Sequence, residues 1–259
     1  MFLMERPLRT RSSFLDVRSS VQTVIGCSTF VGTTISILAQ PLPICHLPAM
    51  FWLSSALGRQ RPGFIEPCIP TRADRAPVGP DWIHEIKHDG YRLIVRKKDD
   101  RVRLFTRRGH DWTDRFPLIR EAVAVLRQRA LVLDGEAVVC DGDGTANFEM
   151  LQSQAHDDRA FLYAFDLLEL GGIDMRTQPL EERRGRLQYL LRRVTGPGVQ
   201  FNDHIVGDGA TIFKHACKLG FEGIVSKHRE HPYRSGPSKW WIKVKNPSAP
   251  GVLRFEDGT

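Results

Sequence analysis

The sequence predicts an α+β fold with largely antiparallel sheets. Short apolar runs, bounded by Gly, Pro, Asn and Asp, recur along the chain at lengths typical of strands. Segments with helical spacing of apolar residues are interspersed among these runs, in no regular alternation. The 259 residues are 41% hydrophobic and 26% charged, an ordinary globular composition with enough apolar residues for a core.

The first half of the fold begins with two strands around a turn. We expect these strands at Trp82–Lys87 and Tyr91–Lys97, with His88-Asp89-Gly90 between them, and a third at Arg101–Thr106. An amphipathic helix follows, because apolar residues recur there at helical spacing: Phe116, Ile119, Ala122, Val123 and Leu126.

The second half contains both strands and helices. Strands are expected at Leu131–Cys140, Phe161–Leu170, Glu222–Lys227 and Lys239–Lys245. Helices are expected at Asn147–Ala155, Leu180–Val194 and Ala210–Leu219, the last of which ends before Gly220.

One lysine is the first candidate for chemistry. Lys87 lies in the run Glu85-Ile86-Lys87-His88-Asp89-Gly90-Tyr91-Arg92, at the end of an expected strand. An exposed lysine has a pKa of about 10.4 and is a poor nucleophile at neutral pH. On a rigid strand near other cations, however, it can lose its proton and attack an electrophile. The alternative is a solvated turn in which Lys87 has no chemical role.

Two further lysines supply those cations. Lys243 and Lys245 are two positions apart in an expected strand, so both side chains point to the same face. Such a pair can hold phosphate groups, and it would depress the pKa of a third lysine close by. A nucleophilic lysine facing a phosphate site indicates nucleotidyl transfer.

Further short motifs follow in order along the chain. They are Thr106-Arg107-Arg108-Gly109, Leu133-Asp134-Gly135-Glu136, Tyr163-Ala164-Phe165-Asp166-Leu167-Leu168, Glu222-Gly223-Ile224-Val225-Ser226-Lys227 and Trp240-Trp241-Ile242-Lys243-Val244-Lys245. With this series the chain resembles the covalent nucleotidyltransferases, and most closely the ATP-dependent DNA ligases of the bacterial end-joining type. The resemblance extends from about Phe64 to about Pro250.

The resemblance implies an adenylation domain of two largely antiparallel sheets flanked by helices, with the nucleotide bound between the sheets. Lys87 would attack the α-phosphate of ATP, and the AMP would then pass to a 5′-phosphate of DNA. The expected nucleotide contacts are Glu85, Asp89, Arg92, Arg107, Glu136, Phe165, Lys227, Lys243 and Lys245. Glu136 and Glu222 would hold Mg²⁺ or Mn²⁺. Arg108 stands where the family pattern has Asn, which leaves open which of the two neighbouring arginines contacts the nucleotide.

Each of these residues also has a purely structural alternative. Asp89 could cap its turn, Phe165 could belong to the core, and Glu136 and Glu222 could be acids at strand ends. Alternative functions are an RNA ligase, a capping-type nucleotidyltransferase, or a non-catalytic module that binds DNA ends.

The charge and the cysteines indicate the setting. A net charge of +7 favours an anionic partner, which we expect to be nicked or broken DNA. An arginine cluster within Leu180–Val194 is expected to be a solvated helix face. The five cysteines form no C-x-x-C pair, which is typical of a reducing cytoplasm; we expect a cytoplasmic protein at the nucleoid.

The two ends of the sequence are expected to lie outside the adenylation domain, which we place at residues 81–247. Residues 1–60 are expected to be a disordered extension rather than a membrane anchor, because polar residues and prolines interrupt their uncharged stretch. Residues 61–80 are expected to be an extended lead-in, and 248–259 a tail. Fourteen residues after Lys245 are too few for the OB-fold domain of such ligases, so we expect weak sealing without a separate DNA-clamping or end-joining protein.

Overall fold

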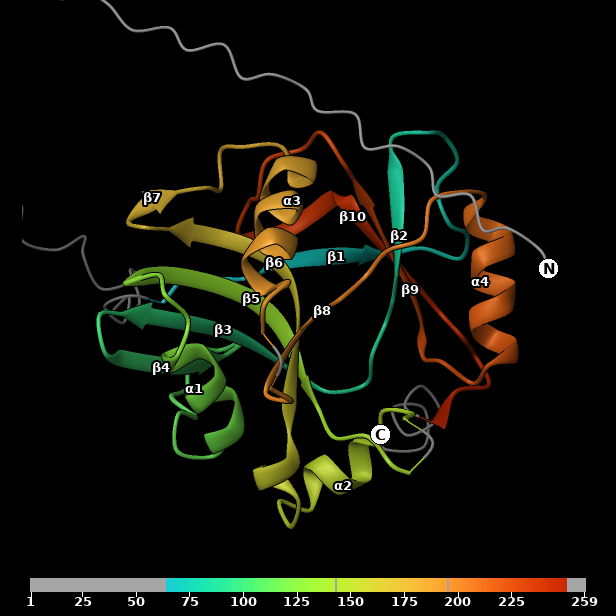
Figure 1. Ribbon diagram of the computed structural model, residues 1–259. Helices are drawn as coiled ribbons and strands as arrows, with labels where there is room; N and C mark the ends of the chain where they lie inside the picture. Colours follow the sequence, from blue (N-terminus) through green and yellow to red (C-terminus); the bar gives the residue numbers. More distant parts are fainter. Residues whose placement is uncertain (1–63, 143, 195, 251–259) are drawn as a thin grey trace, which may run out of the picture. The chain divides into compact units, whose positions relative to one another are not determined.

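A computed structural model describes residues 64–142, 144–194 and 196–250, so the expectations for residues 1–60 lie outside it. Two sheets form this part of the chain (Figure 1). The four-stranded sheet has the order β1-β10-β9-β2, formed by Cys68–Arg72, Gly236–Lys245, Gly223–His228 and Trp82–Ile86. The six-stranded sheet has the order β4-β3-β5-β6-β7, formed by Arg101–Thr106, Tyr91–Lys98, Ala130–Val138, Phe161–Leu170 and Ile173–Asp174, with β8 (Val199–Phe201) beside β6. The predicted α+β fold class is confirmed.

The chain crosses from one sheet to the other at Lys87. β2 pairs with β9, whereas β3 pairs with β4 and β5, so the strands on either side of the lysine do not form a hairpin. Gly90 ends the crossing segment and packs on β5: a Cβ there would lie 2.2 Å from the carbonyl oxygen of Ala137. Only glycine allows this approach, which holds the Lys87 segment at the junction of the two sheets.

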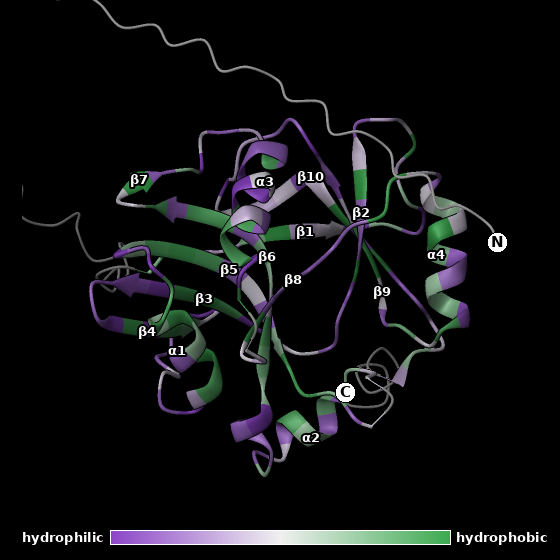
Figure 2. Cartoon of the chain, in the orientation of Figure 1, coloured by the Kyte–Doolittle hydropathy of each residue, from purple (hydrophilic) through white to green (hydrophobic). Residues whose placement is uncertain are grey.

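Helices cover both sheets and complete the core. α1 (Pro117–Ala124) and α3 (Leu180–Leu191) pack on the six-stranded sheet, whose strand β5 is largely hydrophobic in Figure 2. α4 (Gly209–Lys218) covers the apolar residues Ile224 and Val244 of the four-stranded sheet. A short helix, α2 (Phe148–Gln152), follows the loop after β5. Among the described residues, no helix is both long enough and apolar enough to span a bilayer.

Three short strands were missed by sequence reasoning. β1 lies within the expected lead-in and pairs in parallel with β10, and its Cys68 is buried in the core. β8 pairs in parallel with β6, and β7 extends the other end of the sheet. At the C-terminal side, Ala249 is also buried, beyond the expected limit of the domain.

The expectation of a solvated arginine face on α3 is wrong for two residues. Arg183 and Arg184 are buried, and each donates to a buried carboxylate, Asp166 and Glu85 respectively. A buried guanidinium is tolerated only when its charge and N–H groups have such partners. Arg186, Arg192 and Arg193 are exposed, as expected.

Candidate active site

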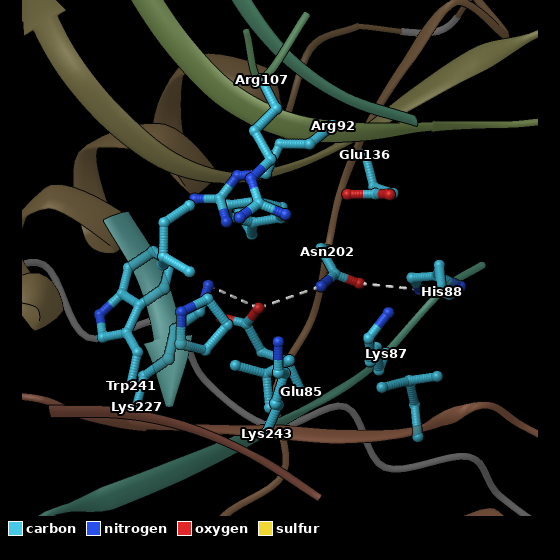
Figure 3. A pocket seen from close by; sticks show the side chains of 15 residues that line it. Glu85, Lys87, His88, Arg92, Arg107, Glu136, Asn202, Lys227, Trp241 and Lys243 are labelled. Carbon is cyan, nitrogen blue, oxygen red and sulfur yellow. Dashed lines mark hydrogen bonds and ion pairs between the residues drawn. The ribbon is translucent and has the colours of Figure 1, made fainter. Parts of the chain in front are cut away.

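A pocket lies between the two sheets and is lined by residues of both (Figure 3). The four-stranded sheet and the segment after β2 contribute Glu85, Ile86, Lys87, His88, Val225, Lys227, Trp241 and Lys243, together with Ile69 and Pro70 of β1. The other sheet and its loops contribute Arg92, Arg107, Glu136, Phe165 and Asn202. The crossing segment therefore places Lys87 where charged groups from both sheets converge.

Glu222 holds the Lys87 ammonium group. Lys87 Nζ donates to Glu222 Oε2 at 2.5 Å, and Lys245 Nζ lies 3.3 Å from the other carboxylate oxygen. The backbone fixes this arrangement, because the Lys87 N–H donates to the carbonyl of Gly223 at 3.0 Å. Gly223 has a φ of +146°, and a Cβ there would lie 2.0 Å from the carbonyl oxygen of Val244. The position thus requires glycine.

Several basic side chains lie close together at the same pocket or beside it. Lys243 has its pKa lowered, first by burial and then by the positive charges of Lys87, Lys245 and Arg107, while Glu222 opposes the shift. Mutual repulsion of this kind means that the cations are close enough to act on one anion together. An anionic group such as a polyphosphate would relieve the repulsion and be held strongly.

Glu136 faces these cations from β5. Its pKa is raised to about 7, first by burial; the positive charges of Lys87 and Arg92 oppose the rise, and the carboxylates of Glu222 and Asp134 contribute to it. Two carboxylates that repel each other beside a phosphate site fit Mg²⁺ or Mn²⁺, which prefer oxygen ligands. In the described part of the chain, no group of three or more His, Cys, Asp or Glu side chains is arranged to hold a metal ion by itself. Waters and substrate oxygens would complete the coordination.

This raised pKa leads to a prediction about stability. Unfolded Glu136 ionises near pH 4.3, so the folded state binds more protons between about pH 4.5 and 7. The free energy of unfolding therefore falls as the pH rises through this window. Between pH 4.5 and 8, the free energy of unfolding of Glu136→Gln should fall less than that of the wild type. The difference should reach up to about 3 kcal/mol in denaturant titrations without metal.

The exposed Glu230→Gln is the matched control and should follow the wild-type pH dependence. Parallel stability curves for wild type and Glu136→Gln across this range would contradict the assignment.

Glu85 and Lys227 form a buried charged wall of the pocket. Lys227 Nζ lies 2.8 Å from Glu85 Oε2, and Arg184 Nη1 donates to Glu85 Oε1 at 2.6 Å. The Lys227 ammonium group also lies 4.0 Å from the ring centroid of Phe165 and 4.1 Å from that of Trp241. Burial lowers the pKa of Lys227, while Glu85 opposes this effect. Two aromatic rings beside paired charges suit a flat heterocycle with polar edges.

Arg92 is fixed by Asp134. Its Nε and Nη2 donate to the two carboxylate oxygens at 2.8 and 2.6 Å, and the Tyr233 hydroxyl donates to Asp134 Oδ2 at 2.7 Å. Burial disfavours the charge of Arg92, but the carboxylate outweighs burial and raises its pKa. The guanidinium group lies 5.0 Å from the ring centroid of Phe165, at the side of the pocket. Asp134 was within a quoted motif, yet sequence reasoning gave it no role, and it did not single out Tyr233.

The structure brings most of the expected residues to one pocket. Those lining it are Glu85, Lys87, Arg92, Arg107, Glu136, Phe165, Lys227 and Lys243. Asp89 and Glu222 line a neighbouring hollow, to which Lys87 and His88 also belong. Lys245 lines neither and approaches the site through Glu222. Trp241 could have been inferred from its period-two spacing to Lys243, whereas no signal in the sequence pointed to Asn202.

The family profile of the ATP dependent DNA ligase domain matches residues 73–245. The chain belongs to this family. The match covers every strand of the pocket except β1. It also includes the Lys87 segment and β10, the strand that carries Lys243 and Lys245. The expected resemblance is therefore confirmed.

Relatives of this ligase domain include bacterial end-joining proteins. It is 41% identical over 187 residues to the multifunctional non-homologous end joining protein LigD of Pseudomonas aeruginosa, a match covering 71% of this chain and 22% of that protein. It is 36% identical over 166 residues to LigD of Mycobacterium tuberculosis, covering 64% and 22%. The chain thus spans about a fifth of the length of these relatives.

Solved structures agree with this assignment. The ligase domain of M. tuberculosis LigD is similar with a TM-score of 0.62 and 35% identity, over 69% of this chain and 60% of that one. A mycobacterial DNA ligase D complexed with ATP and MES has the same TM-score, with 34% identity over 69% and 59%.

Proposed function

We propose that this chain transfers AMP from ATP to a 5′-phosphate of DNA through a covalent adduct on Lys87. The observation that carries the proposal is the convergence of Lys87, Lys243 and Arg107 at one pocket, with the carboxylate of Glu222 lying 2.5 Å from Lys87 Nζ. A nucleophile, a proton acceptor and a site for a polyphosphate are what nucleotidyl transfer on lysine requires.

In the first step, Lys87 Nζ loses a proton, for which Glu222 Oε2 at 2.5 Å is the nearest acceptor. The amine attacks the α-phosphorus; a P–N bond forms while the bond to the bridging oxygen of pyrophosphate breaks. Lys243 and Arg107 stabilise the departing pyrophosphate. A divalent cation held by Glu136 and Glu222 would neutralise phosphate charge during this transfer.

In the second step, an oxygen of the DNA 5′-phosphate attacks the same phosphorus. The P–N bond breaks, AMP becomes joined to the DNA through a pyrophosphate bond, and Lys87 regains its proton. Glu85, Lys227, Phe165 and Trp241 hold the base in both steps.

We propose nicked or broken DNA at the nucleoid as the substrate, with a separate end-joining or DNA-clamping protein as partner. Two observations support this choice. The relatives are named for non-homologous end joining, and the net charge of +7 favours a polyanion.

A pulse and chase with labelled ATP tests this proposal. Protein incubated with α-labelled ATP and Mg²⁺ should retain the label on a denaturing gel. A chase with nicked duplex DNA bearing a 5′-phosphate should move the label to the DNA, whereas a nick with a 5′-hydroxyl should leave it on the protein. Labelling by GTP alone, or transfer to RNA alone, would instead indicate a capping enzyme or an RNA ligase. If no label were incorporated, the proposed reaction would be wrong, and the alternative of a non-catalytic module that binds DNA ends would be favoured.

A further inference from the structure

A chain of hydrogen bonds connects the residue after the nucleophile to the charged wall of the pocket. His88 Nε2 donates to Asn202 Oδ1 at 3.1 Å, and Asn202 Nδ2 donates to Glu85 Oε2 at 3.1 Å. Figure 3 shows both bonds, with Asn202 between the other two residues. Asn202 has a relative exposure of 5%, so water has little access to its side-chain amide.

The backbone of Asn202 belongs to the opposite sheet. Asn202 follows β8, and its N–H donates to the carbonyl of Ala164 in β6 at 2.8 Å. Its own carbonyl accepts from Arg184 Nη2 at 2.8 Å. Glu85, in contrast, is in β2 of the four-stranded sheet. The Asn202 side chain therefore spans the two walls of the pocket.

His88 is held from a second direction. Its ring stacks on Tyr163 with the centroids 4.1 Å apart and an interplanar angle of 12°. Because stacking fixes the ring plane and Asn202 fixes one nitrogen, the orientation of His88 is determined. Lys87 is its neighbour in the chain, so the Lys87 backbone is restrained as well.

The bonds of Glu85 limit what else this carboxylate can accept. Oε2 is occupied by Lys227 and Asn202, whereas Oε1 accepts from Arg184 and keeps one lone-pair direction. A base that presents an amino group there, as adenine does, can donate to Oε1. A base that presents a carbonyl oxygen, as guanine does, would face an acceptor and be disfavoured.

We propose that Asn202 is a positioning residue, which holds the Glu85 carboxylate and the Lys87 segment in one fixed relation. The inference rests on the proposed function, since it concerns the same pocket. Without the Asn202 amide, Glu85 Oε2 keeps Lys227 as its partner but loses its second donor, so the carboxylate is held less firmly, and His88 Nε2 loses its acceptor. Both the preference for adenine and the rate of attack by Lys87 then decrease.

Single-turnover adenylation with ATP and with GTP tests this role. Asn202→Leu, similar in size but unable to bond, should reduce the maximal rate with ATP and the ratio of ATP to GTP rates, each by about 10- to 100-fold. His88→Phe keeps the stacked ring and should reduce mainly the maximal rate. The double variant should lose little more than Asn202→Leu, since both changes break one chain of bonds.

Gln200→Leu is the matched control, because Gln200 is exposed on the same segment and should keep wild-type rates. Asn202→Ala serves if leucine prevents folding. An unchanged ATP to GTP ratio in the folded Asn202 variants would overturn the proposal, and so would fully additive losses in the double variant.

Equilibrium binding separates this inference from the proposed function. In the Lys87→Ala background no adduct can form, and calorimetry compares ATP with GTP directly. Combining Lys87→Ala with Asn202→Leu should lower the preference for ATP. If wild type formed no adduct but this preference still depended on Asn202, the proposed reaction would fail while the positioning role stood. A preference independent of Asn202 would overturn the role.

Discussion

Lys87→Ala should abolish the covalent AMP adduct, with a loss of at least about 10³-fold in labelling rate, because the only proposed nucleophile is removed. Lys87→Arg should fail to the same extent. It preserves the positive charge beside Glu222, but a guanidinium group stays protonated and cannot attack phosphorus. The measurement is incorporation of α-labelled ATP, followed by acid treatment, to which a phosphoramidate is labile.

Two comparisons make this result specific. Lys218→Ala removes an exposed lysine of α4 that lines neither the pocket nor the neighbouring hollow, and should label at the wild-type rate. Both Lys87 variants should retain binding of ATP by calorimetry, because the phosphate and base contacts remain. Full labelling of Lys87→Ala would show that another residue carries the AMP.

The second large effect concerns the stability of the domain. Arg183→Leu should destabilise the fold by about 3–5 kcal/mol, because it leaves the Asp166 carboxylate buried without its counter-charge. Both side chains have 0% exposure, and Arg183 Nε and Nη2 donate to the two Asp166 oxygens at 2.8 Å. Equilibrium denaturation in urea measures the loss, which corresponds to a fall of roughly 10 °C in thermal midpoint.

Arg186→Leu is the control on the same helix. Arg186 is paired with Glu182 at 2.7 Å, but both side chains are about half exposed, so the loss should stay below about 0.5 kcal/mol. Replacing both Arg183 and Asp166 by leucine should recover much of the stability, since no unpaired charge remains. Equal effects of Arg183→Leu and Arg186→Leu would contradict the buried pair.

Local patterns in the sequence were sufficient to predict most of the elements and most of the charged residues that line the pocket. The bounds expected for β4 and β6 are those observed, Arg101–Thr106 and Phe161–Leu170. The amphipathic spacing correctly placed α1, which buries Ile119 and Val123. These features depend on residues a few positions apart, whose side-chain direction follows from the helix or strand period. The spacing of apolar residues therefore predicted these elements without any knowledge of packing.

Contacts between distant residues were decided only by the tertiary structure. The pairing of β2 with β9 rather than β3 makes the Lys87 segment a crossing between sheets, which no local pattern distinguishes from a hairpin turn. Likewise, Asn202 bonds Glu85 across 117 positions, and Arg184 bonds it across 99. Whether a polar side chain is solvated or buried depends on which partner the fold brings to it, because burial is tolerated only when that partner is present. The sequence alone thus predicted the charged residues of the pocket and most of the strands that carry them, whereas the fold decided how those residues are held.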